Sequence, residues 1–435
     1  MGKFDGKRLL MLGTSTGSVA IVRYAKSEGA YVIVTDYLPV ERSEAKRYAD
    51  ESAMISTTDV DALCCFASEK NIDGVFCGVS EVNLRSVYQI ATRLGLPCYF
   101  TQEQWDMTED KAMFKALCQK YHVPVAGKYE ISRIPTEQEL SAIRYPVIVK
   151  PVDSSSCIGI HVCYDRQALL AGIEDAYHNS VKGQIIVEDY IIGDEFTAYY
   201  NIVNGECRLS AMGDKYLNKE QQGLTPLPEA FLFPSRHLNV FLRDVDSHVR
   251  DMIAGIGMKN GLIFIQGITD GENFAVFEAG LRINGSEMHM IVDQINGFNM
   301  MHLLVEYALT GQMHGDLNLE DPHFSGKCAC YLYLVNRGGR IAEIRGLEEV
   351  ENMDGVLDIR LYHRVGQTIQ PSGTLGQRTL RLCLLCDTAQ QLKQTIEQVQ
   401  KTVAVLDEDG NDMLLTGFNT EKVLRWQEDR NKGNL

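Results

Sequence analysis

Strand and helix patterns alternate from residue 8 to about residue 100, and this alternation constrains the fold more than any other feature of the chain. Apolar runs typical of strands and amphipathic runs typical of helices follow one another, the strands at 8–13, 30–35 and 74–77 and the helices at 18–28, 59–69 and 81–94. Repeated strand–helix–strand units align their strands in one direction, so the pattern predicts a parallel, doubly wound sheet. Such sheets bind ligands at the carboxyl ends of their strands, which makes Ser80 and Glu81 candidate substrate contacts.

The first turn of this region, Gly13-Thr-Ser-Thr-Gly17, partly matches a dinucleotide-binding turn, and Asp36 follows at the end of the next strand. Its spacing is Gly-x-x-x-Gly, whereas close approach to a pyrophosphate uses Gly-x-Gly-x-x-Gly. Nicotinamide binding is therefore the weaker reading, against a structural turn or a contact with another small molecule.

The charge balance of the chain disfavours some partners. Among 435 residues, 58 are acidic and 42 basic, which gives a formal charge of −16. This balance argues against nucleic acids and anionic membranes, so a small metabolite or nucleotide is expected. Charged residues interrupt the N-terminal segment, and no apolar run approaches the roughly 20 residues that span a bilayer, so we expect a cytoplasmic protein. The oligomeric state stays open, with a homodimer as one option.

The 12 cysteines are irregularly spaced, as is typical of reduced thiols. Cys383-Leu-Leu-Cys386 matches a Cys-x-x-Cys metal or redox pattern. It lies in an apolar, strand-like run, and no second pair follows at zinc-finger spacing, so buried thiols are the favoured interpretation.

A lysine followed by a loop of small residues comes directly after an apolar strand pattern at 147–149. Pro151 keeps Lys150 extended at the end of that strand. The loop offers backbone N–H groups and hydroxyls with little steric hindrance, from Ser154, Ser155, Ser156 and Gly159. No Gly-Lys-Ser/Thr follows, so this is not a Walker A loop. The layout suits phosphate binding, although an ordinary β-turn has the same composition.

Beyond about residue 100 the regular alternation of strand and helix patterns ends. We expect Thr108 to cap a helix that runs to residue 119, with Lys111 in its first turns, and a single helix at 240–256. Two hairpins are predicted, one at Asn204-Gly205 and one across 262–279. In the second hairpin Gln266 lies opposite Glu278, and both side chains project from one sheet face. Beyond about residue 325 the pattern predicts a small α+β domain.

Several motifs now stand in order along the chain, namely Asp110-Lys111, 149–159, 187–195, Asp214-Lys215 and 277–282. Together they resemble the ATP-grasp superfamily, in particular carbamoyl-phosphate synthase large subunits, biotin carboxylases and carboxylate–amine ligases. The resemblance covers nearly the whole chain. It implies a Rossmann-like pre-ATP-grasp domain at 1–105, a two-subdomain ATP-grasp domain at 106–320 with its lid at about 128–190, and a C-terminal α+β domain at 321–435.

The resemblance also implies roles for individual residues. Lys111 and Lys150 would neutralise ATP phosphates, and the loop from Ser154 to Gly159 would cover them. The nucleoside would be held by side chains and backbone along one segment, at Glu188, Asp189, Tyr190, Ile191 and Glu195. Lys215 would reach the β- and γ-phosphates, and Arg282 would hold the substrate carboxylate or acyl phosphate. Each charged residue, taken alone, also fits a solvated surface position or a structural ion pair, and for Arg282 that partner would be Glu278.

The metal-binding positions depart from the family pattern. Where most members carry an acid, a glutamate and an asparagine, this chain carries Gln266, Glu278 and Gly280. Glu278 with Gln266 and ATP oxygens suits one Mg²⁺ or Mn²⁺. Whether a second ion binds is left open, with compensating ligands to be sought among Asn284, Glu287 and Asp214.

The function implied is an ATP-dependent ligase that joins a carboxylate to an amine or a thiol through an acyl phosphate. Its partners would be ATP and small carboxylate and amine substrates. Bicarbonate is a less favoured acceptor. The alternative is a non-catalytic or weakly active ATP-binding regulatory protein, which the unusual metal positions motivate.

Overall fold

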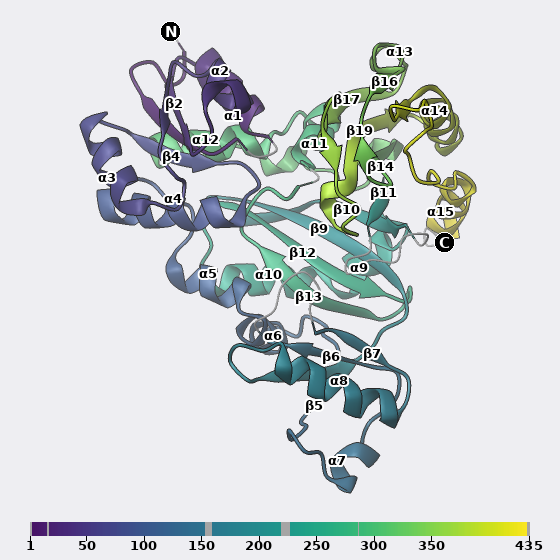
Figure 1. Ribbon diagram of the computed structural model, residues 1–435. Helices are drawn as coiled ribbons and strands as arrows, with labels where there is room; N and C mark the ends of the chain where they lie inside the picture. The colour runs from purple at the N-terminus through teal and green to yellow at the C-terminus, as the bar shows by residue number, and fades with distance from the viewer. Residues whose placement is uncertain (1, 15–16, 153–158, 219–226, 286, 433–435) are drawn as a thin grey trace.

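The computed structural model describes residues 2–14, 17–152, 159–218, 227–285 and 287–432. It contains an eight-stranded sheet at the centre and two four-stranded sheets, one in the N-terminal region and one in the region drawn at the bottom of Figure 1. Two short two-stranded ribbons, β15–β18 and β16–β20, complete the strand pairing.

The N-terminal sheet has the strand order β3-β2-β1-β4, and all its pairs are parallel, which confirms the doubly wound prediction. Its elements are β1 (Arg8–Leu12), α1 (Ser18–Ser27), β2 (Tyr31–Asp36), η1 (Val40–Arg42), α2 (Glu44–Tyr48), β3 (Glu51–Met54), α3 (Val60–Glu69), β4 (Gly74–Cys77) and α4 (Glu81–Leu94). The sequence patterns missed α2 and β3. β3 is an edge strand with no buried residue, so it lacks the apolar run by which inner strands are recognised.

A late segment of the chain returns to this sheet. Helix α12 (Met300–Thr310) packs so closely on β4 that a Cβ atom at Gly74 would lie 2.1 Å from the carbonyl oxygen of Ala308. As a result, the N-terminal sheet and the nearer strands of the central sheet share one hydrophobic core.

The central sheet is antiparallel and has the order β13-β12-β9-β10-β11-β14-β19-β17. Its strands are β9 (Asp194–Val203), β10 (Glu206–Leu217), β11 (Pro228–Phe233), β12 (Gly261–Thr269), β13 (Phe274–Gly280), β14 (Cys328–Val335), β17 (Val356–Leu361) and β19 (Arg378–Cys386). Both predicted hairpins are present. Asn204 and Gly205 have φ values of 52° and 87°, which suits a two-residue turn between β9 and β10. The sheet continues from β11 into β14. Strand pairing therefore crosses the domain boundary that was expected near residue 321.

Two predicted helices differ from those observed. A pair of helices, α5 (Gln102–Glu109) and α6 (Lys111–Lys120), stands where one was expected from Thr108. Asp110 is the cap of α6, because its Oδ1 accepts the N–H groups of Ala112 and Met113 at 2.9 and 3.0 Å. Similarly, the expected helix at 240–256 breaks at Val245 into α9 (Leu238–Asp244) and α10 (Asp246–Gly255).

The sheet at the bottom of Figure 1, with its helices, is named the lid subdomain here. It has the order β5-β8-β6-β7 and comprises β5 (Lys128–Tyr129), α7 (Glu137–Ser141), β6 (Val147–Pro151), β7 (His161–Cys163), α8 (Arg166–His178) and β8 (Ile185–Asp189). Val147, Val149 and Val187 belong to its own small core with α8 residues. Because side chains alternate along a strand, Lys150 and Glu188 lie on the opposite face.

The C-terminal segment adds a separate core over the far strands of the central sheet. The elements after residue 288 that have not yet been named are α11 (His289–Asn296), η2 (Leu317–Leu319), η3 (Phe324–Gly326), β15 (Gly339–Arg340), β16 (Glu343–Arg345), α13 (Leu347–Glu351), β18 (Thr368–Ile369), η4 (Leu375–Gln377), α14 (Ala389–Thr402), β20 (Ala404–Leu406) and α15 (Glu421–Lys432). Cys383 and Cys386 are both buried free thiols on β19, as expected. Within the described ranges, no group of three or more His, Cys, Asp or Glu residues is arranged to hold a metal, and no helix is long and apolar enough to cross a membrane.

Candidate active site

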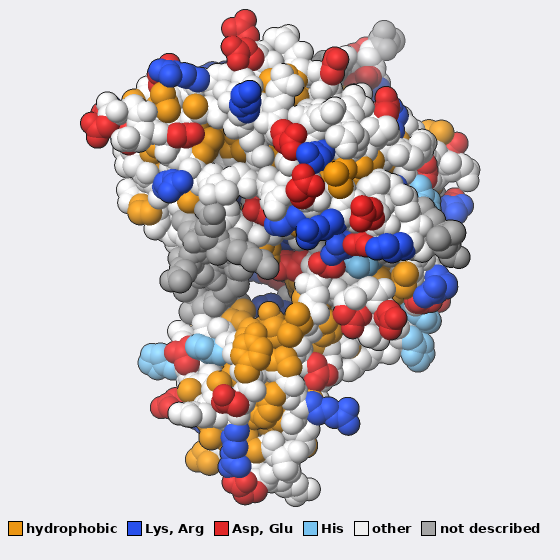
Figure 2. All heavy atoms as spheres, turned by 90° about the vertical axis from the view of Figure 1, so that its right-hand side faces the viewer, with side chains coloured by type: hydrophobic (Ala, Val, Ile, Leu, Met, Phe, Trp, Pro, Cys, Tyr) orange, Lys and Arg blue, Asp and Glu red, His pale blue; other side chains and the backbone are white. Residues whose placement is uncertain are grey.

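The molecule is hollowed between the lid subdomain and the body above it, and acidic and basic side chains are visible inside the hollow (Figure 2). Strands of the central sheet form the body side, and helix α6 packs against β13. The candidate residues are distributed over these two walls.

Glu188 on β8 binds two lysines. Lys150 Nζ lies 2.6 Å from one carboxylate oxygen, and Lys115 Nζ contacts the other. The three side chains are only 8 to 16% exposed. Burial opposes ionisation of Glu188, but the charges of Lys150 and Lys115 outweigh it and hold the pKa below its ordinary value. The lid sheet and α6 are therefore joined by a buried cation–anion–cation cluster.

Lys115 is a site residue that the sequence reasoning missed. It stands four residues after Lys111 on α6, and side chains at this spacing share one helix face. That rule could have identified it. The charge of Lys111 also reaches Glu278, where burial raises the pKa and Lys111 partly opposes that rise.

In the segment 188–191, where the nucleoside base was expected to bind, several polar groups form hydrogen bonds within the protein. The N–H groups of Asp189 and Tyr190 donate to the carbonyls of Gly127 and Pro146 at 2.9 and 3.0 Å. The Asp189 carboxylate accepts the Tyr129 hydroxyl at 2.7 Å. Contacts to a bound base would therefore fall to the carbonyls of this segment and to Ile191.

Glu195 and Lys215 face each other across the β9–β10 hairpin. They are register partners, and Lys215 Nζ donates to Glu195 Oε2 at 2.5 Å. Strand β10 runs through Leu217, and Lys215 therefore lies within the sheet.

The register of the second hairpin is as predicted, with Gln266 opposite Glu278. Gln266 Nε2 donates to Thr197 Oγ1 at 3.3 Å, which leaves the amide oxygen for another partner. At Gly280 a Cβ atom would lie 2.5 Å from the ring of Phe264. Packing therefore closes the position where most of the family carries an asparagine.

Glu278 on β13 is open to solvent, but protein groups surround it closely enough to affect its pKa. Burial is the largest influence on its pKa and raises it, although the positive charges of Arg282, Lys111 and Lys215 act in the opposite direction. A carboxylate that is costly to ionise here would be stabilised by a divalent cation.

Arg282 is held by the N-terminal region. Its Nε and Nη2 donate to Glu81 Oε2 at 3.1 and 2.9 Å, and its guanidinium lies 5.3 Å from the centroid of the Phe264 ring. The ion-pair partner is thus Glu81 and not Glu278, which corrects the structural alternative considered above. Ser80 caps α4 by accepting the Asn83 N–H at 3.3 Å, so a helix cap accounts for this residue.

Of the residues considered as substitute metal ligands, Asp214 and Glu287 are engaged elsewhere through their carboxylates. Asn284 donates to the Tyr199 hydroxyl at 2.6 Å. Asp214 is 1% exposed and accepts the Ser235 hydroxyl at 2.5 Å and the Arg236 N–H at 2.9 Å.

Glu287, the third of these residues, lies in an ion pair with Arg381 at 2.6 Å, and their side chains are 1% and 0% exposed. This pair links the segment after Arg282 to β19. It also adjoins the first turn, because a Cβ atom at Gly17 would lie 2.7 Å from Glu287 Oε1.

The dinucleotide reading is not supported at Asp36. Its carboxylate accepts from the Leu38 N–H and the Ser43 hydroxyl and pairs with Lys46, at 2.6 to 3.0 Å. A carboxylate satisfied in this way and 3% exposed is not placed to bind ribose.

Ser154, Ser155 and Ser156 lie outside the described residues. Gly159, at the end of their loop, has a φ of 70°, and a Cβ atom there would lie 2.9 Å from both Pro151 and Asn179. A glycine is therefore required where the loop rejoins the lid subdomain.

Residues 117–217 match the family model described as D-ala D-ala ligase C-terminus. Dapdiamide A synthase of Enterobacter agglomerans is 20% identical over 272 residues, which are 60% of this chain and 62% of that protein. The chain therefore spans less than two thirds of that relative.

Solved structures of similar fold include the L-amino acid ligase of Bacillus licheniformis, with a TM-score of 0.73 and 19% identity over 93% of this chain and 99% of that one. The biotin carboxylase domain of the Hydrogenobacter thermophilus 2-oxoglutarate carboxylase, solved with magnesium ADP and bicarbonate, gives a TM-score of 0.75 and 16% identity over 98% and 95% of the two chains. Residues 117–217 thus match an ATP-grasp domain, and the chain as a whole shares the fold of these solved structures.

Proposed function

We propose that the protein is an ATP-dependent ligase that activates a carboxylate as an acyl phosphate and transfers the acyl group to an amine or, as a less favoured acceptor, a thiol. One observation carries the proposal. The buried Lys150–Glu188–Lys115 cluster, which joins the lid sheet to α6, and the Gln266–Glu278 pair of the central sheet combine cations suited to a triphosphate with a carboxylate suited to a divalent ion.

Within the protein the charged groups partly neutralise one another, which limits the cost of burying them. Bound ATP would exchange these partners. Its phosphate oxygens would take the ammonium groups of Lys150 and Lys115, and Glu188 would then accept from the amino group of adenine. Glu195 and Lys215 would separate in the same way, toward the ribose hydroxyls and the phosphates.

The residues present fit one divalent ion better than two. Glu278 offers a carboxylate and Gln266 a neutral amide oxygen, and the Gly280 position cannot add a ligand. Mg²⁺ or Mn²⁺ held there with ATP oxygens would neutralise phosphate charge. A magnesium nucleotide in the biotin carboxylase structure supports this assignment.

In the reaction, a carboxylate oxygen attacks the γ-phosphorus of ATP, the bond to ADP breaks, and an acyl phosphate forms. The amine nitrogen then attacks the acyl carbon, phosphate leaves with the former carboxylate oxygen, and the nitrogen loses protons to solvent. Arg282, held by Glu81, would position the acyl phosphate, and Lys215 would stabilise charge on the transferred phosphoryl group.

The test is ADP release with Mg²⁺ or Mn²⁺ across pooled amino acids, other small carboxylates and amines. We expect acceptor-dependent turnover that is lost in Glu278→Ala and retained in Glu272→Ala, a change at the exposed tip of the same hairpin. ATP binding by calorimetry without turnover in any pool would refute the ligase and favour the regulatory alternative, which Gln266 motivates.

A further inference from the structure

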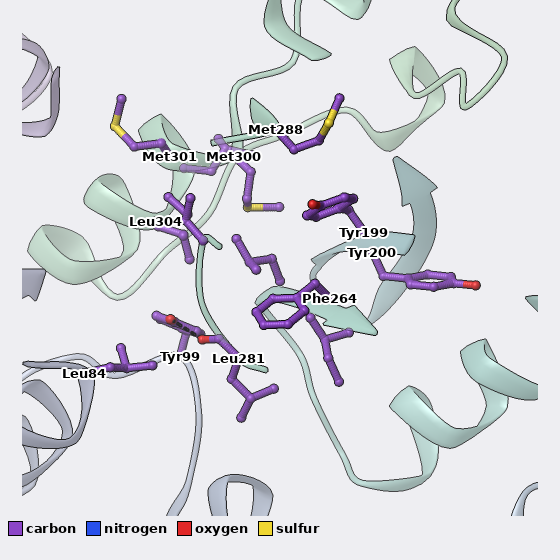
Figure 3. Close-up of a cluster of buried hydrophobic side chains, with 14 of the residues drawn as sticks. Leu84, Tyr99, Tyr199, Tyr200, Phe264, Leu281, Met288, Met300, Met301 and Leu304 are labelled. Carbon is purple, nitrogen blue, oxygen red and sulfur yellow. Dashed lines mark hydrogen bonds between the residues drawn. The ribbon is translucent and has the colours of Figure 1, made fainter. Parts of the chain in front are cut away.

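A small cavity lies between the central sheet and the chain segment that includes α11 and the start of α12. Its volume is about 30 Å³. Most of its wall is apolar, with Tyr199, Leu262, Ile283, Met288, Phe298 and Met300 among the lining residues. In Figure 3 the side chain of Met300 extends toward Tyr199, with Met288 above them and Phe264 below.

The cavity adjoins the proposed reaction centre. Tyr199 stands two residues after Thr197 on β9, and these residues lie opposite Phe264 and Gln266 respectively. Residues on one face of a strand repeat about every 7 Å, so the cavity wall begins about that far from the Gln266–Glu278 pair. Ile283, another wall residue, directly follows Arg282.

Apart from His289, the polar side chains in the wall have partners within the protein. Asn201 and Ser210 both donate to Glu320, and Asn284 donates to the Tyr199 hydroxyl. His289 adds one atom, Nδ1, that is buried without a hydrogen-bond partner. Because burial lowers the pKa of His289 to about 3, its ring is neutral at pH 7. No lining residue therefore offers a charge to a ligand within the described part of the chain.

We propose that this cavity receives the side chain of the carboxylate substrate, which is therefore a small carboxylate with a short, uncharged, mainly apolar side chain. This inference rests on the proposed ligase function. This volume has room for about two water-sized groups, since one water needs about 10–15 Å³ of such space, and it therefore fits a side chain of about two carbons. Met288 and Met300 are unbranched and flexible, so the pocket adapts to slightly longer chains. A charged side chain is excluded, because the wall provides no counter-charge.

The experiment measures kcat/KM for ADP release over amino acids with linear side chains from zero to four carbons, and over aspartate and lysine. Glycine, alanine, 2-aminobutyrate, norvaline and norleucine form the linear series, with one amine in fixed excess. We expect kcat/KM to rise about fourfold for each methylene that enters the cavity and then to fall. Aspartate and lysine should be poor substrates.

Enlarging the cavity should move the optimum. In Met300→Ala the preferred substrate side chain should be one or two carbons longer than in the wild type. In the milder Ile283→Val this shift in preferred length should be smaller. Met107→Ala is the matched control, because Met107 packs against the same core without lining the cavity. Its optimum should equal that of the wild type, which separates pocket shape from lost stability.

The outcomes distinguish the two proposals. Turnover with the same side-chain preference in wild type, Met300→Ala and Ile283→Val would overturn the cavity assignment while leaving the ligase intact. Efficient turnover of aspartate or lysine would also overturn it. A complete absence of acceptor-dependent ADP release from the wild type would reject the ligase, and the cavity assignment with it.

Discussion

Replacing Arg381 with methionine would test how the segment that follows Arg282 is held in place. Arg381 and its partner Glu287 are 0% and 1% exposed, and their charged groups lie 2.6 Å apart. Arg381 also contacts Asp358 at 2.9 Å, but Asp358 is 31% exposed and can regain water. The main cost of Arg381→Met is therefore the charge left on Glu287.

The magnitude follows from this burial. Removing one partner of a buried ion pair costs about 3–5 kcal/mol, because the other charge stays in a poorly solvated site. Arg360 lies 3.6 Å from the same Glu287 oxygen and supplies partial compensation. We therefore expect a loss near the lower end, about 3 kcal/mol in the free energy of unfolding. Adding Glu287→Gln removes the stranded charge and should restore about 2 kcal/mol of that loss.

Urea unfolding is the assay, followed by far-UV circular dichroism and by tryptophan fluorescence. The chain has 2 tryptophans, Trp105 and Trp426, which lie in separate hydrophobic cores. Agreement between the signals would justify a two-state treatment. Arg345→Met is the control, because the Arg345–Glu343 pair is solvent-exposed and should contribute nothing measurable. A loss below about 1 kcal/mol in Arg381→Met, or a double variant no more stable than the single one, would refute the reasoning.

Three further predictions concern the site. Lys115→Met should weaken ATP binding about 10- to 100-fold in calorimetry, since a hydrogen bond to a charged group is lost, whereas Lys120→Met at the end of the same helix should not. The pKa of buried His289 is lowered to about 3, so the unfolded chain binds the extra proton first as the pH falls. Stability should therefore drop by about 1.4 kcal/mol between pH 7.5 and 5.5, and an unchanged pH profile in His289→Gln would contradict this. Glu81→Gln should raise KM for the carboxylate more than it lowers kcat, because Arg282 loses its anchor; unchanged kinetics would remove Glu81 from the positioning of Arg282.

Local rules were sufficient for part of the site. The Gln266–Glu278 register followed from the alternation of side chains along strands, which depends only on residues close in sequence. The same kind of rule, applied to the helix that begins at Lys111, would have found Lys115. The error at Thr108 had a local cause as well, because Asp110 is equally suited to cap a helix and stands closer to the helix that follows.

Other features had no local signal. Arg282 and Glu81 are 201 positions apart, and Arg381 and Glu287 are 94 apart. Such pairs depend on how separate sheets and helices pack, and an arginine carries the same sequence pattern whichever acid it meets. The closure of the Gly280 position by Phe264 belongs to the same class, because it results from contact between neighbouring strands.

By itself, the sequence determined the parallel N-terminal sheet, the two hairpins, the strand that carries Lys150 and the likeness to ATP-grasp ligases, because periodicity, turn residues and ordered motifs are local properties. Tertiary structure alone decided which charges meet. It placed Lys150 and Lys115 on one carboxylate, anchored Arg282 on Glu81, and left an apolar cavity about two strand residues from the Gln266–Glu278 pair. The physical reason is that ion pairs and cavities form between surfaces brought together by packing.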